Sequence, residues 1–558
     1  MAKPKKLGEV FIESGAITED QLKTALQVSK EKGIVLGETL LELGYVDEKT
    51  LYKGLEYFYN VPYIDLSGIV VDKKACTMIT EDLAKKHVVI PVKLENNVLT
   101  VAMKDPLDFY AMDDIKNATK MNISIAISPK KDILNAIDRY YGSEVAEKAF
   151  EDLKREYSKI NLEDLSGITE NEVTNAPVVR LINSILQNAI KANASDIHIE
   201  PTDVNLRIRF RIDGQLHEVM SSTMSAHPAM ITRIKIMAQM DIAEKRIPQD
   251  GRVETSVNGK VIDLRISSLP TVFGEKVVIR ILGGSGGIMN RSQLGISERN
   301  LVLFDKIAQS TNGIILVSGP TGSGKTSTLY SLLNDINTPS VNIITVEDPV
   351  EYKLEGINQV QVNAKAGLTF ASGLRSILRQ DPDIIMIGEI RDGETAQIAI
   401  RASITGHLVL STIHTNDVAS SVARLVDMGV ESYMVSSSLV GVISQRLVRN
   451  ICPRCKEAYQ PIQSERDMLK IDDAQVLYRG VGCPYCNATG YKGRSGIHEI
   501  LVVTREIRDL INRQATTDQL MQMAIQQGTV TLQESCAELV RAGKTTMEEL
   551  LKVTYSVD

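Results

Sequence analysis

The sequence predicts a multidomain α/β protein that contains a P-loop domain, and three observations lead to this fold class. The chain has 558 residues, more than a single hydrophobic core normally serves. Residues 319–326 read Gly-Pro-Thr-Gly-Ser-Gly-Lys-Thr, which fits the P-loop pattern G-x-x-x-x-G-K-[ST]. Short apolar runs typical of strands alternate with helical patterns on both sides of this motif. We therefore expect several domains, of which one binds nucleotide.

Composition and charge narrow the class of protein. The net charge is −7, from 63 basic and 70 acidic residues, which argues against a chain that coats nucleic acid through bulk charge. No apolar segment of the signal-peptide kind follows the basic N-terminus, and no apolar run approaches membrane-spanning length. We expect a cytosolic protein that binds no nucleic acid and contacts the membrane only through partners.

An internal repeat opens the chain and predicts a tandem helical module over residues 1–58. The repeated positions are Leu7, Gly8, Gly15 and Leu22 in the first copy and Leu36, Gly37, Gly44 and Leu51 in the second. Each copy has the pattern of a short helix, a glycine turn and a second helix, with Thr18 or Asp47 as the N-cap of that second helix. Two copies are too few for a solenoid, so they predict a small paired module.

Residues 59–142 predict a small α/β unit that completes the N-terminal part. The expected elements are strands at 88–92 and 98–102 around a turn at 95–97, and helices near 110–120 and 131–141. Residues 143–172 are charged and helical in pattern, but they have no clear apolar face. We interpret this segment as a linker.

A second domain, PAS-like or of another α+β kind, is expected over residues 173–282. Three segments alternate as half-buried strands do, at 197–200, 206–211 and 276–281. The strands of this domain carry five arginines, Arg207, Arg209, Arg211, Arg265 and Arg280. Such arginines normally form a solvated face, but beside a P-loop domain some can reach a neighbouring phosphate as arginine fingers. Residues 283–289, rich in glycine and serine, predict a flexible linker that lets the flanking parts rotate.

The P-loop lies in the last part of the chain, residues 290–558, between a predicted strand at 314–317 and a predicted helix at 326–333. Glycines let the backbone N–H groups converge on phosphate oxygens, and the helix N-terminus adds positive partial charge. Lys325 would reach the β- and γ-phosphates, and the Thr326 hydroxyl would hold Mg²⁺. The expected nucleotide-binding residues are Gly319, Thr321, Gly322, Ser323, Gly324, Lys325 and Thr326.

Acidic residues follow two further strands that are expected in this domain. The strand at 343–346 leads to Glu347 and Glu351. The strand at 384–387 leads to Glu389. Because parallel strands end at the ligand-binding edge of their sheet, we expect these carboxylates at the nucleotide. Glu389 would contact Mg²⁺ directly or through water, and Glu347 or Glu351 would orient the attacking water.

Two histidines flank a third strand of the same domain. His407 precedes the apolar segment 408–413 and His414 follows it. A single histidine is more often structural than catalytic, but a pair that brackets a strand of this sheet predicts a sensor of the γ-phosphate.

Four cysteines predict a metal site in an insertion at about 449–490. They form two C-x-x-C pairs, Cys452 with Cys455 and Cys483 with Cys486. Four thiolates at such spacing suit tetrahedral Zn²⁺ with no open position, so the site would be structural. The alternative is two redox pairs or free thiols. Helices with short breaks are expected over 503–558.

Together these motifs resemble the secretion ATPase superfamily that drives type II secretion and type IV pilus assembly. The resemblance covers essentially the whole chain. Its signature segments are residues 194–201, 240–252, 345–351, 388–392 and 405–417.

This resemblance implies a RecA-like motor domain in a ring of six chains that hydrolyses ATP. It implies that Glu351 is the catalytic carboxylate, that Glu389 is associated with Mg²⁺, and that Arg265 and Arg280 act on ATP as fingers. The implied work is the extension of type IV pili through an inner-membrane platform protein, at the cytoplasmic face of the membrane. The alternative is a type II secretion ATPase. Metal-binding cysteines are typical of the assembly and secretion branches, which disfavours pilus retraction.

The opening repeat resembles the module that binds cyclic di-GMP in some of these ATPases. The residues at the ligand-facing positions are Lys6, Leu7, Gly8, Leu36 and Gly37. Lys6 stands where the pattern favours Arg, and Val35 stands at the equivalent place in the second copy. Two interpretations stay open, a cyclic di-GMP site and a helical module that docks on a partner.

Two other classes of function use the same P-loop. A nucleotide-sensing scaffold would bind ATP without turnover, which the intact set of carboxylates and arginines disfavours. A DNA-uptake or conjugation motor gains no support from the acidic balance of the chain.

Overall fold

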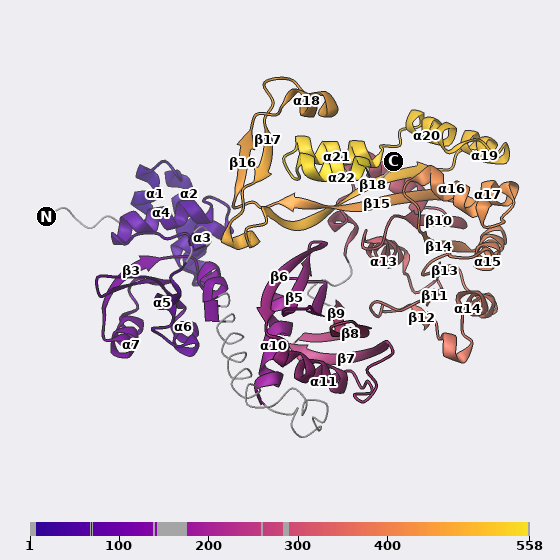
Figure 1. The fold of residues 1–558 in the computed structure, drawn as a ribbon. Coiled ribbons are helices and arrows are strands. Elements are labelled where there is room, and N and C mark those ends of the chain that lie inside the picture. The colour runs from indigo at the N-terminus through magenta and orange to yellow at the C-terminus, as the bar shows by residue number, and fades with distance from the viewer. Residues whose placement is uncertain are drawn as a thin grey trace. The chain divides into compact units, whose positions relative to one another are not determined.

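The computed structural model describes residues 7–66, 69, 71–137, 140–141, 176–257, 260–282 and 289–555. The predictions made for Lys6, for the linker at 143–172 and for nearly all of the glycine-rich linker lie outside the described residues. The chain divides into two compact units, the smaller built mainly from residues before Asn188 and the larger mainly from residues after it (Figure 1). In the described part of the chain, no helix combines the length and the apolar character needed to cross a membrane.

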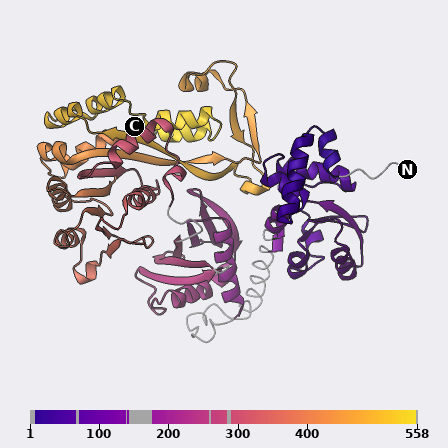
Figure 2. The same cartoon turned by 180° about the vertical axis from the view of Figure 1, so that it is seen from behind.

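Four helices form the opening module, drawn in indigo in Figure 2, and they follow the order that the repeat predicts. They are α1 (Leu7–Glu13), α2 (Glu19–Lys32), α3 (Leu36–Glu42) and α4 (Glu48–Tyr59). Thr18 and Asp47 are the N-caps of α2 and α4, and each side chain accepts a hydrogen bond from a backbone N–H in the first helical turn. Gly15 and Gly44 make the turns, with φ of 71° and 68°. This is a conformation that glycine adopts without strain.

The repeated glycines at the starts of α1 and α3 have a packing reason. A Cβ atom on Gly8 would lie 2.6 Å from a methyl group of Leu22, and one on Gly37 would lie 3.1 Å from a methyl group of Leu51. The four positions are equivalent in the two copies, so the repeat encodes the same close contact between helices twice. These glycines are therefore explained by the fold itself, with or without a ligand.

A three-stranded sheet follows, with the order β1 (Val89–Glu95), β2 (Val98–Met103) and β3 (Asn122–Ile127). Strands β1 and β2 form the predicted hairpin, in which Asn96 and Asn97 take positive φ of 47° and 64°. The helices are α5 (Lys73–Cys76), α6 (Glu81–His87) and α7 (Phe109–Thr119), and residues 130–137 and 140–141 are also helical. The helices predicted near 110–120 and 131–141 are thus present, whereas α5 and α6 were not expected. Strand β3 was also missed, although isoleucine occupies every second position from Ile123 to Ile127, the alternation typical of a half-buried strand.

The next sheet is antiparallel throughout, with the order β6-β5-β4-β9-β8-β7. Its elements are α10 (Ala176–Lys191), β4 (Asp196–Pro201), β5 (Leu206–Ile212), β6 (Gln215–Ser222), α11 (His227–Met237), β7 (Gln249–Val257), β8 (Lys260–Thr271) and β9 (Gly274–Leu282). The three predicted strands are confirmed as β4, β5 and β9, and the domain is α+β. Its likeness to a PAS domain stays a prediction.

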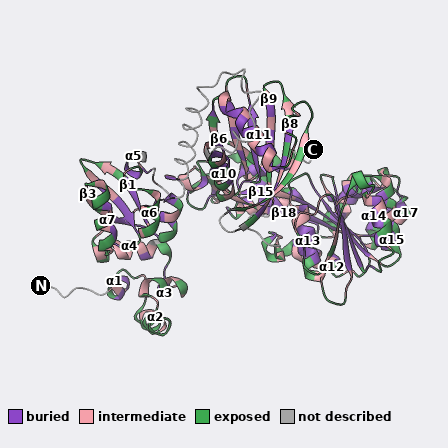
Figure 3. Ribbon diagram, turned by 90° about the horizontal axis from the view of Figure 1, so that it is seen from below, coloured by how far each residue is buried: buried purple, intermediate pink, exposed green. Residues whose placement is uncertain are grey.

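The P-loop domain is built on a seven-stranded sheet with the order β12-β11-β13-β14-β10-β15-β18. The strands are β10 (Gly313–Ser318), β11 (Ile343–Glu347), β12 (Asn358–Gln361), β13 (Ile384–Ile387), β14 (Leu408–Ile413), β15 (Leu439–Ile451) and β18 (Tyr491–Val502). All neighbours pair in parallel except β15 with β18. The central strands are buried from end to end, as their unbroken apolar runs predict (Figure 3).

Helices cover both faces of this sheet. Successive side chains of a strand point to opposite faces, so each strand contributes to two cores. Ile314 and Leu316 of β10 enter one core, which contains residues of α14 (Phe370–Ile377), α15 (Gly393–Ile404) and α16 (Val418–Asp427). Ile315 and Val317 enter the other, with α12 (Glu298–Ala308) and α13 (Lys325–Ile336). The helix after the P-loop is thus anchored on the strand before it.

The cysteine-bearing insertion leaves the sheet after β15 and returns at β18. It contains β16 (Lys456–Tyr459), α18 (Gln463–Leu469) and β17 (Leu477–Gly480). Strand β18 belongs to the main sheet and was not predicted. Short helix α17 (Ser432–Ser438) precedes β15, and the chain ends in α19 (Arg505–Asn512), α20 (Thr517–Gln526), α21 (Leu532–Arg541) and α22 (Met547–Tyr555), the broken helical segment that the sequence predicts.

Candidate nucleotide and metal sites

The parallel strands of the P-loop domain place most of the predicted site at one edge of the sheet. The pairing of β10 with β14, β14 with β13, and β13 with β11 brings the carboxyl ends of four strands together. The P-loop follows β10, Glu389 follows β13 and His414 follows β14, while Glu347 ends β11. This is the edge at which open α/β sheets bind their ligands.

The P-loop has the backbone that its glycines allow. Gly319, Gly322 and Gly324 have φ of 142°, 80° and 88°. A Cβ atom on Gly319 would lie 2.4 Å from the carbonyl oxygen of Gln445, so this position has no room for a side chain. The loop leads directly into α13, whose N-terminus favours bound anions.

The residues of this loop fit a bound phosphate. Lys325 is buried, and its Nζ donates to the carbonyl oxygens of Gly319 at 2.8 Å and Pro320 at 3.1 Å. Burial lowers the pKa of Lys325, while the charge of Glu389 acts in the opposite direction. The buried Ser323 Oγ has no hydrogen-bond partner among the described residues. A phosphate would supply charge to the lysine and an acceptor to the serine.

Gln445 of β15 contacts the P-loop and was not predicted as a site residue. Its Nε2 donates to the Ser323 carbonyl at 2.7 Å, and its Oε1 accepts from Thr328 Oγ1 at 2.6 Å. Gln445 is 2% exposed. Its two hydrogen bonds join β15, the P-loop and α13 in the interior of the domain. The strand also contains Ser444, Arg446, Arg449 and Asn450, so no local signal marked Gln445.

Glu389 and His414 meet at the P-loop edge, as predicted for residues after neighbouring strands. His414 Nε2 lies 3.2 Å from one carboxylate oxygen of Glu389, and Arg391 lies 2.6 Å from the other. His407, by contrast, stands at the opposite end of β14, where its Nδ1 lies 2.9 Å from the Ala402 carbonyl. The structure does not bring His407 to the nucleotide edge, because a strand that two residues bracket separates them by its whole length.

Glu347 is enclosed by hydrogen-bond donors. It is 3% exposed, and its carboxylate accepts from Tyr330 Oη, from Thr345 Oγ1 at 2.6 Å and from Gln359 Nε2 at 3.0 Å. Both of its oxygens are thus engaged by protein groups, which leaves Glu351 as the acid better placed to receive a proton.

Glu351 lies on the loop between β11 and β12 and is largely buried. Burial raises the pKa of Glu351 above its ordinary value, although the charges of Arg265 and Arg280 act to lower it. The Oε2 atom has no hydrogen-bond partner among the described residues. Arg265 Nη2 donates to the Val350 carbonyl at 3.2 Å, so this arginine stands beside the loop within the same chain.

The five strand arginines fall into two groups. Arg207 and Arg209 pair with Glu200 of β4, and Arg211 pairs with Asp196. Burial alone would raise the pKa of Glu200, but hydrogen bonds from Arg209 and Lys276 lower it to about 2. These side chains therefore form ion pairs within their own sheet. The charges of the two remaining residues, Arg265 and Arg280, act to lower the pKa of Glu351. Arg280 also pairs with Asp196 at 3.0 Å.

The four cysteines of the insertion come together. The Sγ atoms of Cys452, Cys455, Cys483 and Cys486 all lie within 4.8 Å of one another. The Cys483 and Cys486 sulfurs are 3.7 Å apart, close to the ~3.8 Å edge of a tetrahedron with Zn–S bonds of about 2.3 Å. The Cys483 N–H donates to Cys486 Sγ at 3.2 Å, a contact that stabilises thiolate charge. The donor set thus fits Zn²⁺, which would hold the two ends of the insertion together.

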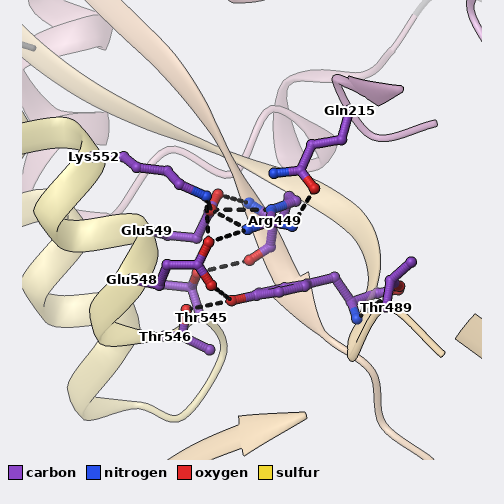
Figure 4. A network of polar contacts seen from close by, with 9 residues as sticks. Gln215, Arg449, Thr489, Thr545, Thr546, Glu548, Glu549 and Lys552 are labelled. Atoms are coloured by element: carbon purple, nitrogen blue, oxygen red, sulfur yellow. Dashed lines mark hydrogen bonds and ion pairs between the residues drawn. The ribbon is translucent and has the colours of Figure 1, made fainter. Parts of the chain in front are cut away.

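The base of this insertion is joined to the last helix by a buried arginine (Figure 4). Arg449, near the end of β15, donates to Glu549 through Nε at 3.0 Å and through Nη2 at 2.7 Å, and its backbone N–H donates to the same carboxylate. The guanidinium lies 3.7 Å from the centre of the Tyr491 ring. Tyr491 begins β18, so one side chain ties α22 to both strands that carry the insertion.

Comparisons with known proteins agree with these sites. A family model described as Type II/IV secretion system protein matches residues 171–552, and a model of the MshEN domain matches residues 59–147. The type IV pilus assembly ATPase PilB of Myxococcus xanthus is 41% identical over 563 residues, which cover 98% of each chain. The type II secretion system protein E of Pseudomonas aeruginosa is 48% identical over 419 residues, 74% of this chain and 83% of that one.

One solved structure shows the same fold. The ATPase DotB of Legionella pneumophila covers 67% of this chain and 95% of its own, with a TM-score of 0.51 at 20% identity.

Proposed function

Since the chain belongs to the Type II/IV secretion system protein family and is a P-loop ATPase, we propose that it hydrolyses ATP to power the assembly of type IV pili. The observation that carries the chemistry is the shared edge of Lys325, Glu389 and His414, together with the half-buried Glu351 on the loop after β11. The observation that favours pili is the similarity to a pilus assembly ATPase over 98% of both chains.

The roles follow from the position of each side chain. The N–H groups of the P-loop and Lys325 bind the phosphates, and the Thr326 hydroxyl and Glu389 are the groups available to Mg²⁺, which neutralises phosphate charge when bound. Glu351 takes a proton from the attacking water, and its raised pKa makes it a stronger base than an exposed glutamate. Arg265 and Arg280 stabilise the negative charge that develops on the leaving phosphate.

The same proposal assigns the larger assembly. Six chains form a ring at the cytoplasmic face of the inner membrane, and rotations between domains are passed to a membrane platform protein. The resemblance of the whole chain to the secretion ATPases supports this arrangement. Zn²⁺ in the cysteine cluster keeps the insertion folded, and cyclic di-GMP is the ligand that the opening repeat would take.

A second candidate function is the type II secretion ATPase. The observation that favours it is the 48% identity to a type II secretion protein E, higher than the 41% identity to the pilus ATPase, although over a shorter segment. Deleting the gene separates the two candidates. Loss of surface pili with normal protein secretion supports pilus assembly, and loss of secretion with intact pili supports the alternative.

The ATPase mechanism is tested by phosphate release from the purified full chain. Glu351→Gln keeps the size of the side chain but accepts no proton from water, so we expect turnover to fall by on the order of a hundredfold or more. Glu355→Gln, on the same loop and exposed, is the matched control and should be near wild type. If Glu389→Gln alone has the large effect, the two acids have the opposite roles.

A further inference from the structure

A buried polar cluster lies behind the loop that carries Glu351, and the roles assigned above do not use it. Its members are Tyr330 of α13, Thr345 and Glu347 of β11, and Gln359 of β12. Tyr330 and Thr345 are fully buried, and Glu347 nearly so. We call this set the Tyr330 cluster.

Within the cluster, the carboxylate of Glu347 is the common acceptor. Tyr330 Oη donates to Oε2, while Thr345 Oγ1 and Gln359 Nε2 donate to Oε1. Burial and the hydrogen bond to Glu347 raise the pKa of Tyr330, so its hydroxyl remains a donor throughout the working pH range. The cluster is therefore internally satisfied, which gives each side chain one defined position.

From this position, Tyr330 holds the Glu351 loop directly. The Glu351 N–H donates to Tyr330 Oη at 3.4 Å. The ring of Tyr330 meets the ring of Tyr352 edge to face, with centroids 5.0 Å apart and an interplanar angle of 84°. The hydroxyl and the ring of one side chain thus contact two consecutive residues of the loop.

Gln359 holds the same loop from the other side. Its Nε2 donates to the Tyr352 carbonyl at 3.2 Å, and its Oε1 accepts from the Leu354 N–H at 2.7 Å. The backbone around Glu351 is therefore fixed by side chains of two different elements, while the Oε2 atom of Glu351 has no hydrogen-bond partner among the described residues.

Tyr330 stands on the helix that begins with Lys325 and Thr326 of the P-loop. Because a helix is stiff over such a short distance, the phosphate-binding residues and Tyr330 move as one body. We propose that Tyr330 is a positioning residue, which sets the Glu351 carboxylate in one place relative to the phosphates bound by the P-loop. This inference rests on the proposed function, in which Glu351 is the general base.

The test is Tyr330→Phe in the full chain, which keeps the ring contact with Tyr352 and removes the hydroxyl. We expect kcat for ATP hydrolysis to fall roughly tenfold to a hundredfold, because a base displaced by about 1 Å loses that much. KM for ATP should stay within about twofold, since the P-loop is unchanged. Tyr433→Phe, an exposed tyrosine on α17, is the matched control and should leave both constants unchanged.

The pH profile separates positioning from a general loss of structure. A loosened loop exposes Glu351 to water, so its pKa falls and the acidic limb of the kcat profile moves to lower pH. The charged groups that face Glu351 are Arg265, Arg280, Glu347 and Asp263, and all are retained in Tyr330→Phe. A lower kcat with an unmoved acidic limb, or an unchanged kcat, would overturn the proposal.

Two further variants keep the outcome decisive. Gln359→Met releases the loop from the other side and should reproduce the lower kcat and the shifted limb if Tyr330→Phe fails to fold. In a Glu351→Gln background, Tyr330→Phe should add little further loss, since the residue acts through Glu351. Additive losses would contradict the positioning role. If Glu351→Gln alone keeps normal turnover, the role of general base that the proposed function assigns to Glu351 fails instead, independently of Tyr330.

Discussion

At the scale of single residues, the P-loop is organised around the buried Lys325. Lys325 holds its own loop through the carbonyls of Gly319 and Pro320, and burial lowers its pKa. A phosphate would replace neutral acceptors with a full negative charge. A bound phosphate would therefore offset the cost of burying the charge of Lys325.

Lys325→Ala should abolish turnover, because the γ-phosphate loses its cation in a site with little water. Phosphate release by the full chain is the measurement, with circular dichroism to show that the variant is folded. Lys353→Ala, on an exposed position of the Glu351 loop, is the control and should keep wild-type turnover. Near-normal turnover in folded Lys325→Ala would remove the P-loop from the mechanism.

At the scale of secondary-structure elements, the long strand β15 links the P-loop to the cysteine insertion. Gln445, in the middle of this strand, contacts the P-loop, and the C-terminal end of the strand leads into the insertion. Arg449 and Glu549 tie that end to α22 by buried charge-assisted hydrogen bonds. The insertion is thus anchored on the main sheet, although its cysteines lie away from the nucleotide edge.

The cysteine cluster should contain one Zn²⁺ per chain, measured by elemental analysis of protein purified without chelator. Removal of the metal should unfold the insertion between β15 and β18 and leave ATP binding largely intact, because the P-loop is held by Gln445 and the two cores. Cys455→Ser should lower the zinc content, while Cys536→Ala, outside the cluster, should not. Zinc-free native protein would contradict the assignment.

A second link between elements depends on pH. Glu499 of β18 is buried and accepts from the first N–H of α16, that of Val418, at 3.0 Å, and from the first N–H of α21, that of Leu532, at 3.1 Å. Burial raises the pKa of Glu499 from 4.5 to about 7. Between these values the folded state keeps a proton that the unfolded state has lost. The stabilising contribution of Glu499 is therefore complete below pH 4.5 and is lost as pH rises towards about 7.

Glu499→Gln removes this titration, so the difference in unfolding free energy between wild type and variant should change with pH. We expect a change of up to about 3 kcal/mol between roughly pH 4.5 and 7. Neighbouring His498 has its pKa lowered by burial to about 4 and acts in the opposite direction, but it is present in both proteins and cancels. Urea unfolding at a series of pH values is the measurement, and a constant difference would contradict the prediction.

At the scale of the whole molecule, the chain contains a helical module and a P-loop ATPase domain, and each of them has its own hydrophobic core. The opening helices bury Phe11, Leu40 and Leu51 among themselves. The repeated glycines are needed for the contacts of Leu22 and Leu51. A ligand role of this module therefore depends on polar groups around the glycines.

Cyclic di-GMP should bind the full chain more weakly than it binds modules with Arg at the position of Lys6. Lysine offers a point charge in place of a planar fork, and Val35 supplies no charge at the equivalent place in the second copy. Titration calorimetry is the measurement, with Lys6→Ala expected to weaken binding further and Lys23→Ala, exposed on α2, as the control. No heat at high micromolar ligand leaves docking on a partner as the function of the module.

Much of this protein follows from signals that are local in the sequence. The P-loop, the N-caps Thr18 and Asp47, the Asn96–Asn97 turn and the paired cysteines each depend on residues a few positions apart. Such patterns work because backbone conformation and metal geometry constrain neighbouring residues directly. The placement of carboxylates that follow successive parallel strands can also be predicted from sequence, since such strands end at one edge of the sheet.

Only the tertiary structure decided which of two chemically similar residues enters the site. His414 reaches Glu389 while His407 lies a strand length away, and Arg265 stands at the Glu351 loop while Arg209 is neutralised by Glu200. Tyr330 and Gln445 act on loops far from them in the chain, and neither belongs to a motif. The reason is physical. A hydrogen bond between distant segments depends on strand order and burial, which no short stretch of sequence contains.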